Sequence, residues 1–586
     1  MNKIKILPKE IYTRIAAGEV IERPSNVVKE LIENSIDASA SEIIVEIIAG
    51  GRKLIRVTDN GVGISKDDLE LSIQPHATSK IEKFEDIYNL FTLGFRGEAL
   101  SSIVNVSKTT ISSKPEGQQT AYQIVVHAGE VISLTECSRT NGTTVEVRDL
   151  FYNLPARLKF LKSDYTEKIH IIRTVEEYAI AYPNISFKLY SDNNLVFSVS
   201  STENLLKRIK DILKKELVDN FVYFEYNDKI TKLYGYITPI EYSHINKSLQ
   251  MYYINKRPVS VRVLSQALYD AYKEFLSTGR HPVGIIFLHL PAERIDVNVH
   301  PTKRIVKLKD EEFIYNTLKN IIQKTIKEYY TKTESNFSTE NTDFKENTKK
   351  FMVSEPKTSL YLQKQKDESY LIKTENLELK PQENIDTLSN QLNKIGLQNS
   401  TYLGQLHRTY LLFETPEGLV LIDQHAASER ILYEKFLSLK NISTQKLLFP
   451  INLELKPSDF EAIKPYIETL NALKFEVTIT GKNSLGFYSI PSLFNTRDVK
   501  DFIFNFIENL ISDFSNKTDN LTPKEKIARN ACRAAIKAND LMTLSEVNNL
   551  INELANCEAP FVCPHGRPII VTLAIPKVEK LFQRRK

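Results

Sequence analysis

Residues 29–38, KELIENSIDA, and residues 59–64, DNGVGI, decide how the first part of this 586-residue sequence folds. Apolar residues at helical spacing around the first stretch predict a helix over residues 25–38. Strands are expected at 43–48 and 53–58, and the second of them ends directly before DNGVGI. The first polar stretch therefore lies on a helix, and the second lies in a turn that follows a strand.

The residue types in these stretches indicate a nucleotide site. Glu30 and Asn34 are four residues apart and share one face of the helix, where a carboxylate could activate water and an amide could help to hold Mg²⁺. Asp59 precedes a turn in which Gly61 and Gly63 permit a ligand to approach the backbone closely. Each feature is common alone, and an exposed polar helix face is the alternative for the Glu–Asn pair.

A third stretch supports the nucleotide interpretation. Residues 94–100, GFRGEAL, supply two glycines before an expected helix start, where backbone N–H groups can bind phosphate. The sequence contains no Walker-type GxxxxGK[ST] motif, which excludes a P-loop nucleotide site.

A second chemically active group lies near the end of the sequence. Asp423, His425 and Glu429 fall where an expected strand gives way to a helix. Their carboxylate and imidazole groups suit Mn²⁺ or Zn²⁺. Cys563 and His565 add the softer ligands that Zn²⁺ prefers. A simple turn is the alternative for the Cys-Pro-His motif, but two complementary clusters favour a metal site.

The composition is that of a globular protein with several domains. A length of 586 residues with 42% hydrophobic content allows roughly three or four cores. A net charge of +4 is nearly neutral for this length, so any nucleic-acid binding must come from local basic patches. Four cysteines are too few for a disulfide scaffold, and we expect a reducing cytosol. We expect no transmembrane helix, because no apolar run approaches ~18 residues. We expect no signal peptide, because the N-terminal residues lack its apolar region and cleavage site.

A change in composition divides the sequence. Residues 332–398 are polar, charged and without periodicity, which predicts a disordered linker. Before the linker, mixed helices and strands predict a first domain over 1–215 and a subdomain over 216–331. After it, we expect one further α+β domain over 399–586.

The order of these motifs resembles the GHKL superfamily of ATPases, which DNA gyrase, Hsp90, histidine kinases and MutL share. Within that superfamily the sequence is most similar to the MutL family of DNA mismatch-repair ATPases. The resemblance is carried by KELIENSIDA (29–38), DNGVGI (59–64), HATSKI (76–81), GFRGEAL (94–100), GTTVEVRDLFYNLPARLKFL (142–161) and DVNVHPTK (296–303). It implies an N-terminal GHKL-type ATPase sandwich followed by a transducer subdomain.

The resemblance also implies roles for individual residues. Glu30 would be the general base that aligns the attacking water, and Asn34 would ligate Mg²⁺. Asp59 would bind the adenine amino group with support from Thr143, and Lys303 would reach the γ-phosphate from the transducer subdomain. The pocket and its lid would be shaped by Gly61, Gly63, Thr78, Gly94 and Gly97.

The C-terminal clusters resemble the nuclease-active subgroup of the same family. The subgroup's metal motif is complete here as DQHA from Asp423, then Glu429 and Glu434, and residues 563–568 match its CPHGRP motif. The resemblance implies a metal-dependent endonuclease that uses Mn²⁺ or Zn²⁺. The implied ligands are Asp423, His425, Glu429, Cys563 and His565, with Asp423 and Glu429 also catalytic. Residues 531–533, ACR, resemble the subgroup's third C-terminal motif and make Cys532 a candidate auxiliary ligand, with a buried thiol as the alternative. For Glu434 an exposed helix residue is the alternative.

Two short segments predict binding surfaces. Gln445, Leu448 and Pro450 form a QxxLxP pattern, which resembles the peptide that docks on the bacterial sliding clamp. Arg257 and Arg262 match basic positions that the family links to DNA contact, and such contacts to phosphate would be independent of sequence.

The sequence therefore predicts an α+β protein with a C-terminal dimerisation and endonuclease domain. The resemblance implies a homodimer that ATP switches between states, recruited to DNA by a MutS-type mismatch sensor and the sliding clamp. We expect a cytoplasmic, nucleoid-associated location and no membrane partner.

Two alternatives remain from the sequence. One is a matchmaker ATPase without nuclease activity, whose C-terminal metal is structural. The other is a different GHKL ATPase, although we identify neither the strand-cleaving tyrosine domain of a topoisomerase nor the phosphoacceptor domain of a histidine kinase. A chaperone would not explain the C-terminal ligand clusters.

Overall fold

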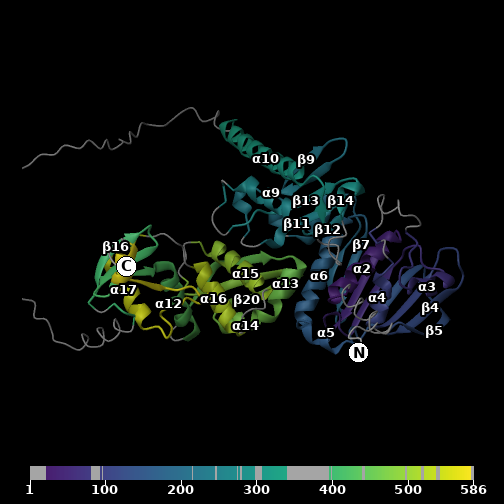
Figure 1. The fold of residues 1–586 in the computed structure, drawn as a ribbon, viewed down its shortest axis with the longest axis horizontal. Helices are drawn as coiled ribbons and strands as arrows, with labels where there is room; N and C mark the ends of the chain where they lie inside the picture. Colours follow the sequence, from purple (N-terminus) through teal and green to yellow (C-terminus); the bar gives the residue numbers. More distant parts are fainter. Residues whose placement is uncertain are drawn as a thin grey trace, which may run out of the picture. The chain divides into compact units, whose positions relative to one another are not determined.

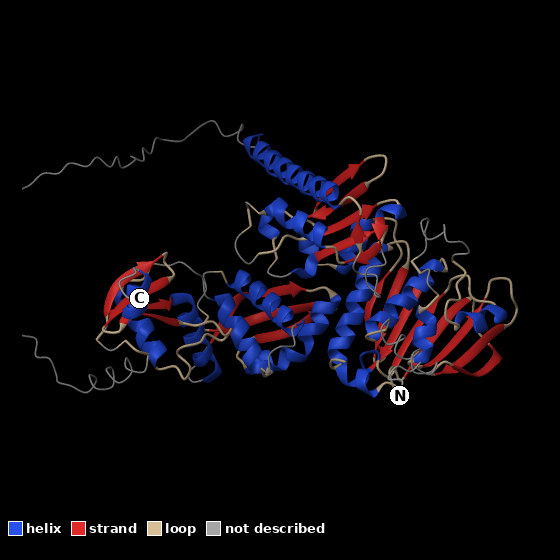
Figure 2. Cartoon of the chain, in the orientation of Figure 1, coloured by secondary structure: helices blue, strands red, loops and turns tan. Residues whose placement is uncertain are grey.

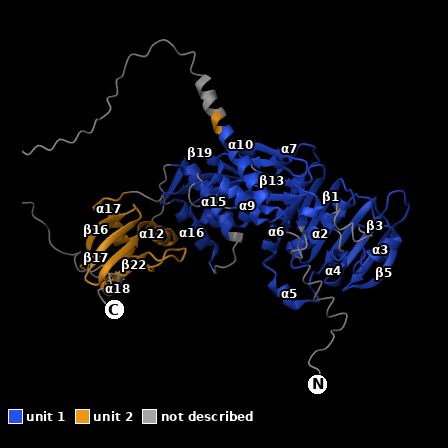
Figure 3. Ribbon diagram, turned by 45° about the horizontal axis from the view of Figure 1, so that its top comes forward, with its two compact units in different colours: residues 1–329, 439–535 blue, residues 330–438, 536–586 orange. Residues whose placement is uncertain are grey.

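The computed structural model describes residues 21–80, 93–94, 97–213, 215–244, 247–273, 275–276, 280–296, 306–339, 395–397, 399–438, 443–494, 498–515, 521–535 and 541–581. Helices and strands mix throughout these residues, which confirms the α+β class (Figure 2). The chain forms two compact units: residues 1–329 with 439–535, and residues 330–438 with 536–586 (Figure 3). Most of the predicted linker, 332–398, lies outside the described residues, and the expected domain boundaries stay predictions.

An eight-stranded mixed sheet dominates the first unit (Figure 1). Its strands, in spatial order, are β5 (Glu130–Cys137), β4 (Ala121–His127), β3 (Lys108–Lys114), β6 (Gly142–Arg148), β2 (Leu54–Asp59), β1 (Glu42–Ile48), β7 (Ser186–Ser191) and β8 (Asn194–Val199). The accompanying helices are α2 (Pro24–Asp37), α3 (Lys66–Ser72), α4 (Ala99–Asn105), α5 (Pro155–Phe160), α6 (Asp164–Ala181), α7 (Leu205–Ile212) and α8 (Lys215–Val218). The predicted helix over 25–38 and the strands at 43–48 and 53–58 are thus confirmed as α2, β1 and β2.

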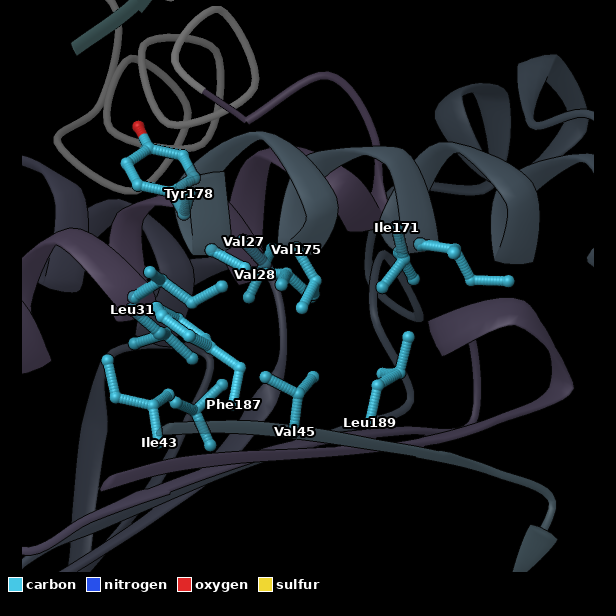
Figure 4. Close-up of a cluster of buried hydrophobic side chains, with 14 of the residues drawn as sticks. Val27, Val28, Leu31, Ile43, Val45, Ile171, Val175, Tyr178, Phe187 and Leu189 are labelled. Atoms are coloured by element: carbon cyan, nitrogen blue, oxygen red, sulfur yellow. The ribbon is translucent and has the colours of Figure 1, made fainter. Parts of the chain in front are cut away.

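Helices α2 and α6 pack on one face of this sheet. Val27, Val28 and Leu31 of α2 are buried against Val45 of β1 and Phe187 of β7 (Figure 4). Each such side chain contributes about 1.5–3 kcal/mol when it is fully buried. Pro24 at the start of α2 has the fixed φ of a helical first residue and needs no amide donor there. The apolar face of α2 is therefore anchored, which orients its polar face.

A five-stranded sheet follows in the same unit, in the spatial order β12–β11–β13–β10–β9. Its elements are β9 (Val222–Asn227), β10 (Lys232–Ile237), β11 (Gln250–Ile254), β12 (Arg257–Val259), β13 (Gly284–His289) and α9 (Arg262–Tyr272), with the short pair β14 (Ile295–Asp296) and β15 (Lys307–Leu308). Helix α10 (Glu311–Thr339) begins in this unit, and its residues from 330 onward belong to the second. Met251, Tyr253 and Phe287 join the same hydrophobic cluster as the core under α2. The two sheets therefore share one continuous core.

The described residues between 443 and 535 add a three-stranded sheet and four α-helices to the first unit. The elements are β19 (Thr444–Glu454), α13 (Pro457–Ile463), α14 (Ile467–Ala472), β20 (Glu476–Gly481), β21 (Ser484–Pro491), α15 (Val499–Ser515) and α16 (Pro523–Ala535), with the strand order β19–β21–β20.

The second unit is built on a four-stranded antiparallel sheet. Its strands, in spatial order, are β16 (Thr401–Leu406), β17 (Tyr410–Thr415), β18 (Gly418–Asp423) and β22 (Ile570–Ala574). Helices α12 (Gln424–Ser438), α17 (Leu544–Ala555) and α18 (Ile575–Leu581) complete it. Strand β18 runs directly into α12, as the sequence predicts for the strand-to-helix change near Asp423. Among the described helices, none has the apolar length that crossing a bilayer requires.

A buried arginine ties α7 to the end of α6. The guanidinium of Arg208 donates to the carbonyl oxygens of Ala179 (2.6 Å), Pro183 (2.7 Å), Ile185 (2.9 Å) and Ser200 (2.7 Å). Its side chain is fully buried. One cation thus satisfies carbonyls from several chain segments.

We predict that Arg208→Met destabilises the first unit by at least about 1–3 kcal/mol, because buried carbonyls lose their donor. The measurement is the urea midpoint of unfolding, followed by circular dichroism. The control is Lys207→Met, one residue earlier on α7 and exposed, which should change stability by no more than about 0.5 kcal/mol. Equal midpoints for the two variants would contradict the prediction.

Candidate nucleotide site and candidate metal centre

Asp59 is the last residue of β2, and its carboxylate accepts three hydrogen bonds. Its Oδ1 accepts hydrogen bonds from the backbone N–H groups of Gly61 (2.9 Å) and Thr143 (3.1 Å), and its Oδ2 accepts one from the Ser35 hydroxyl (2.9 Å). Thr143 reaches Asp59 because β6 pairs with β2. The structure thus brings together Asp59 and Thr143, the two residues that the sequence analysis assigns to the adenine contact. Ser35 was missed by sequence reasoning, although it lies within KELIENSIDA.

Two predicted glycines leave no room for a side chain. Gly63 has φ +75°, and a Cβ there would lie 2.4 Å from the carbonyl oxygen of Lys114. Gly97 has φ +61°, and a Cβ there would lie 2.4 Å from the carbonyl oxygen of Ala77. Both positions combine a left-handed backbone with a close approach, which only glycine tolerates.

The carboxylate of Asp37 organises the segment that contains Gly94. It accepts hydrogen bonds from the backbone N–H groups of Leu93 (2.9 Å) and Gly94 (3.1 Å). The Lys80 ammonium lies 2.5 Å from Asp37 Oδ2 and 3.2 Å from Asn34 Oδ1. Two oxygen atoms of α2 therefore converge on one positive charge, and that donor set is the kind that Mg²⁺ prefers. Asp37 and Lys80 were not assigned from the sequence.

Thr78 lies next to this group, and its Oγ1 accepts a hydrogen bond from the backbone N–H of Lys80 (3.2 Å). Lys303, which the sequence places at the γ-phosphate, lies outside the described residues.

Glu30 belongs to a buried group of charges on α2. The Lys29 ammonium lies 2.7 Å from Glu30 Oε1 and 3.4 Å from Glu33 Oε1. Burial alone would lower the pKa of Lys29, but the two carboxylates outweigh burial and raise that pKa. The Tyr178 hydroxyl donates to Glu33 Oε1 (2.5 Å), and burial together with this carboxylate raises the pKa of Tyr178. Lys29 is therefore charged and Tyr178 protonated at neutral pH.

The two arginines predicted to contact DNA lie in different environments. Arg257 is 8% exposed, with its Nε 3.7 Å from Glu33 Oε1 and its Nη2 donating to the carbonyl of Leu93. Arg262 begins α9 and is exposed. It lines a groove of about 1220 Å³ that also includes Lys247, Tyr252, Tyr269 and Lys456. Only Arg262 therefore faces solvent in this structure.

Three of the predicted metal ligands meet in the second unit. One ligand atom from each of Glu429, Cys563 and His565 lies within 4.8 Å of the others. His565 Nδ1 is 3.1 Å from Glu429 Oε2, and His425 Nε2 is 3.3 Å from Glu429 Oε1. The isolated bridge between Val562 and Pro568 closes the CPHGRP loop. Cys563 is buried in the hydrophobic cluster that includes Ala426 and Ala427 of α12.

The chemistry of these groups fits a metal ion. Burial alone would raise the pKa of Glu429, but hydrogen bonds from His425 and His565 outweigh burial and lower that pKa to about 2. Glu429 also raises the pKa of His425. His425 Nδ1 and His565 Nε2 are buried nitrogen atoms without a hydrogen-bond partner. A soft thiol, two imidazoles and an ionised carboxylate are a donor set that Zn²⁺ and Mn²⁺ accept.

Other residues of the motifs have structural contacts. Asp423 Oδ1 accepts a hydrogen bond from the backbone N–H of Ala426 (2.9 Å) and so caps α12. Glu434 accepts hydrogen bonds from the backbone N–H groups of Glu558 (2.7 Å) and Ala559 (3.2 Å), which fixes the chain before the CPHGRP loop. Cys532 is 1% exposed within α16 of the first unit.

The QxxLxP segment protrudes from its strand. The pairing of β19 with β21 is interrupted between Lys446 and Ile451, so the intervening residues leave the ladder. Leu448 is 97% exposed and Phe449 81% exposed, and Gln445 and Pro450 are exposed as well. Two adjacent large apolar side chains are thus presented to solvent.

Three family models match the chain. "Histidine kinase-, DNA gyrase B-, and HSP90-like ATPase" matches residues 22–147, and "DNA mismatch repair protein, C-terminal domain" matches residues 209–327. "MutL C terminal dimerisation domain" matches residues 403–542.

Similar proteins cover the whole chain. The "DNA mismatch repair protein MutL" of Clostridium acetobutylicum is 38% identical, over 99% of this chain and 100% of that protein. The protein of the same name from Caldanaerobacter subterraneus is 36% identical, over 100% of both chains. Among solved structures, "Aquifex aeolicus MutL ATPase domain complexed with ADP" is 30% identical, covering 46% of this chain and 93% of that one, with a TM-score of 0.36. "Crystal Structure of N terminal domain of a DNA repair protein" is 29% identical, covering 56% of this chain and 99% of that one, with a TM-score of 0.47.

We predict that Asp37→Asn destabilises the first unit by about 1–3 kcal/mol, because Lys80 loses its buried anionic partner. The urea midpoint measures the loss. The control is Asp67→Asn on the exposed first turn of α3, which should change stability by no more than about 0.5 kcal/mol. A wild-type midpoint for Asp37→Asn would show that the charge on this carboxylate is dispensable.

Proposed function

Because the chain belongs to the MutL family of DNA mismatch-repair proteins, we propose that it couples mismatch recognition by a MutS-type sensor to metal-dependent nicking of DNA. The ATPase and dimerisation domains of that family match residues 22–147 and 403–542, so the chain is an ATPase that forms a homodimer. The convergence of Glu429, Cys563 and His565 within 4.8 Å is the observation that carries the nuclease proposal.

The proposed ATP site uses the polar face of α2 and the turn after β2. Glu30 would align the water that attacks the γ-phosphate, and Asn34 would supply an oxygen to Mg²⁺. Asp59 would bind the adenine amino group, since two backbone N–H groups hold its Oδ1 and orient its carboxylate. Lys303 would contact the γ-phosphate. The subdomain that carries Lys303 would therefore respond to ATP hydrolysis.

The proposed nicking site uses the cluster around Glu429. His425, Glu429, Cys563 and His565 would hold Mn²⁺ or Zn²⁺, and Asp423, at the start of the same helix, would supply a further carboxylate ligand. Such an ion, when bound, lowers the pKa of a water and stabilises charge on the scissile phosphate. The alternative is a matchmaker in which the same ion is only structural, because cysteine ligands occur in structural as well as catalytic zinc sites.

Two surfaces would bring the protein to its partners. Arg262 and Lys247 beside the groove would contact DNA phosphates without reading sequence. Leu448 and Phe449 would insert into an apolar pocket of the sliding clamp, since both are exposed far beyond what an ordinary strand presents. Because DNA is the expected partner, we place the protein on the nucleoid in the cytoplasm.

For the ATPase, we predict that Glu30→Gln lowers kcat by about 10²–10⁴-fold while ATP still binds, because only the proton acceptor is removed. Single-turnover hydrolysis and nucleotide titration measure the two quantities. The control is Glu116→Gln on an exposed turn, which should hydrolyse ATP like the wild type. Unchanged hydrolysis by Glu30→Gln would remove Glu30 from the mechanism.

For the nuclease, we predict that the wild type converts supercoiled plasmid to open circle with Mn²⁺ and that Asp423→Asn does not. Asparagine caps a helix as well as aspartate does, so α12 should stay folded in the variant. Agarose-gel assays with and without ATP provide the measurement, and Glu417→Gln in the exposed β17–β18 turn is the control.

Each other outcome of the nicking assay has a distinct meaning. Equal nicking by wild type and Asp423→Asn would indicate contamination or a wrong ligand assignment. Absence of nicking even with the sliding clamp added would favour the matchmaker alternative. If the clamp stimulates the wild type, Leu448→Ala should abolish that stimulation without changing basal nicking.

A further inference from the structure

A buried row of alternating charges runs from Glu30 to Arg257. Lys29 lies 2.7 Å from Glu30 Oε1 and 3.4 Å from Glu33 Oε1, and Arg257 Nε lies 3.7 Å from the same Glu33 oxygen. Each of the four side chains is at most 11% exposed. Charges this close and this shielded from water interact strongly. The position of each therefore depends on the next.

Arg257 enters this row from the five-stranded sheet. It is the first residue of β12, directly after a turn in which Asn255 and Lys256 have φ +48° and +63°. The Asn255 side chain donates to the carbonyl of Leu290 (2.9 Å) and accepts from the Leu290 N–H (3.0 Å). These two hydrogen bonds fix the turn to the residue that follows β13. Arg257 also donates to the carbonyl of Leu93, beside the glycine-rich segment of the nucleotide site. One guanidinium thus contacts both α2 and that segment.

The charge balance of the row depends on Arg257. With it, two carboxylates face two cations. Without it, Glu30 and Glu33 would share the single ammonium of Lys29 in a buried site, and removing one partner from a buried charge pair is strongly unfavourable. Lys29 would then move toward Glu33 and away from Glu30.

Arg257 and Glu33 form an ion pair without a close hydrogen bond between them. Arg257 Nε and Glu33 Oε2 are buried polar atoms without a hydrogen-bond partner. Their 3.7 Å contact is longer than a hydrogen bond, so a small movement of β12 would change its strength. The strength of this contact therefore depends on how the five-stranded sheet packs against α2.

We propose that Arg257 is a positioning residue for ATP hydrolysis, acting on Glu30 through Glu33 and Lys29. The sheet that carries Arg257 would then control hydrolysis without its arginine touching the nucleotide. This inference rests on the proposed role of Glu30 as general base. It gives Arg257 a function at its observed position in place of DNA contact.

The test measures ATP affinity and single-turnover kcat separately in the full-length chain. Arg257→Met should lower kcat by about 10²-fold, because displacement of a catalytic group by about 1 Å has that effect. ATP affinity should stay within about twofold, since Arg257 is argued to act on the water and not on binding. The control is Arg294→Met, which breaks a 2.8 Å ion pair with Asp310 at the edge of the same subdomain and should leave both quantities unchanged.

A charge-compensating variant separates positioning from general loss of structure. Glu33→Gln added to Arg257→Met removes the second carboxylate and leaves Lys29 to pair with Glu30 alone. The double variant should therefore hydrolyse ATP faster than Arg257→Met. A purely structural role predicts the opposite, because two buried contacts would then be lost instead of one.

The possible results lead to separate conclusions. Wild-type kcat in Arg257→Met, or a double variant no faster than Arg257→Met, would overturn the inference. If Arg257→Met does not fold, Arg257→Gln takes its place with the same readouts, since glutamine also removes the charge but keeps a hydrogen-bond donor in the buried site. If Glu30→Gln hydrolyses ATP normally, the proposed function fails, whereas an inactive Glu30→Gln beside a normal Arg257→Met overturns only the inference.

Discussion

The packing of α2 against the eight-stranded sheet is the constraint on which the nucleotide site depends. Val27, Val28 and Leu31 bury one face of the helix, and the opposite face then carries its polar groups in a fixed direction. Glu30, Asn34 and Asp37 cannot move independently, because any rotation of α2 would expose the apolar face. The hydrophobic core thus restricts where the polar side chains of the proposed ATP site can point.

Burial then gives these polar groups their properties. Glu33 is 1% exposed and would be unfavourable there if it were alone. Lys29, Tyr178 and Arg257 surround it with two positive charges and a hydroxyl donor. Because each partner is held by a different element, a shift of one element changes the field at the others. The charged groups around Glu33 are thus coupled to the five-stranded sheet through electrostatic interactions as well as through packing.

The second unit applies the same principle with different chemistry. Glu429 is buried on α12, and two histidines outweigh the effect of that burial on its carboxylate. Asp423 caps the same helix, while Glu434 holds the chain that leads to the CPHGRP loop. Two residues of one motif thus stabilise the scaffold on which the cluster of Glu429, Cys563 and His565 is assembled. One motif therefore contains residues that hold the scaffold in place as well as residues of the proposed metal site.

The sequence by itself determined the α+β class, the local elements around each motif and the family, because helical and strand periodicity and motif order are local properties of the chain. It also identified Asp59 and Thr143 as partners through resemblance. Only the tertiary structure decided that Arg257 is buried against Glu33 while Arg262, five residues later, faces solvent. It likewise showed that Asp37 binds Lys80 and the backbone N–H groups of Leu93 and Gly94, next to residues of the proposed ATP site. The reason is physical: burial and pairing depend on how distant segments pack, and local sequence patterns do not specify which partner a charged side chain will meet.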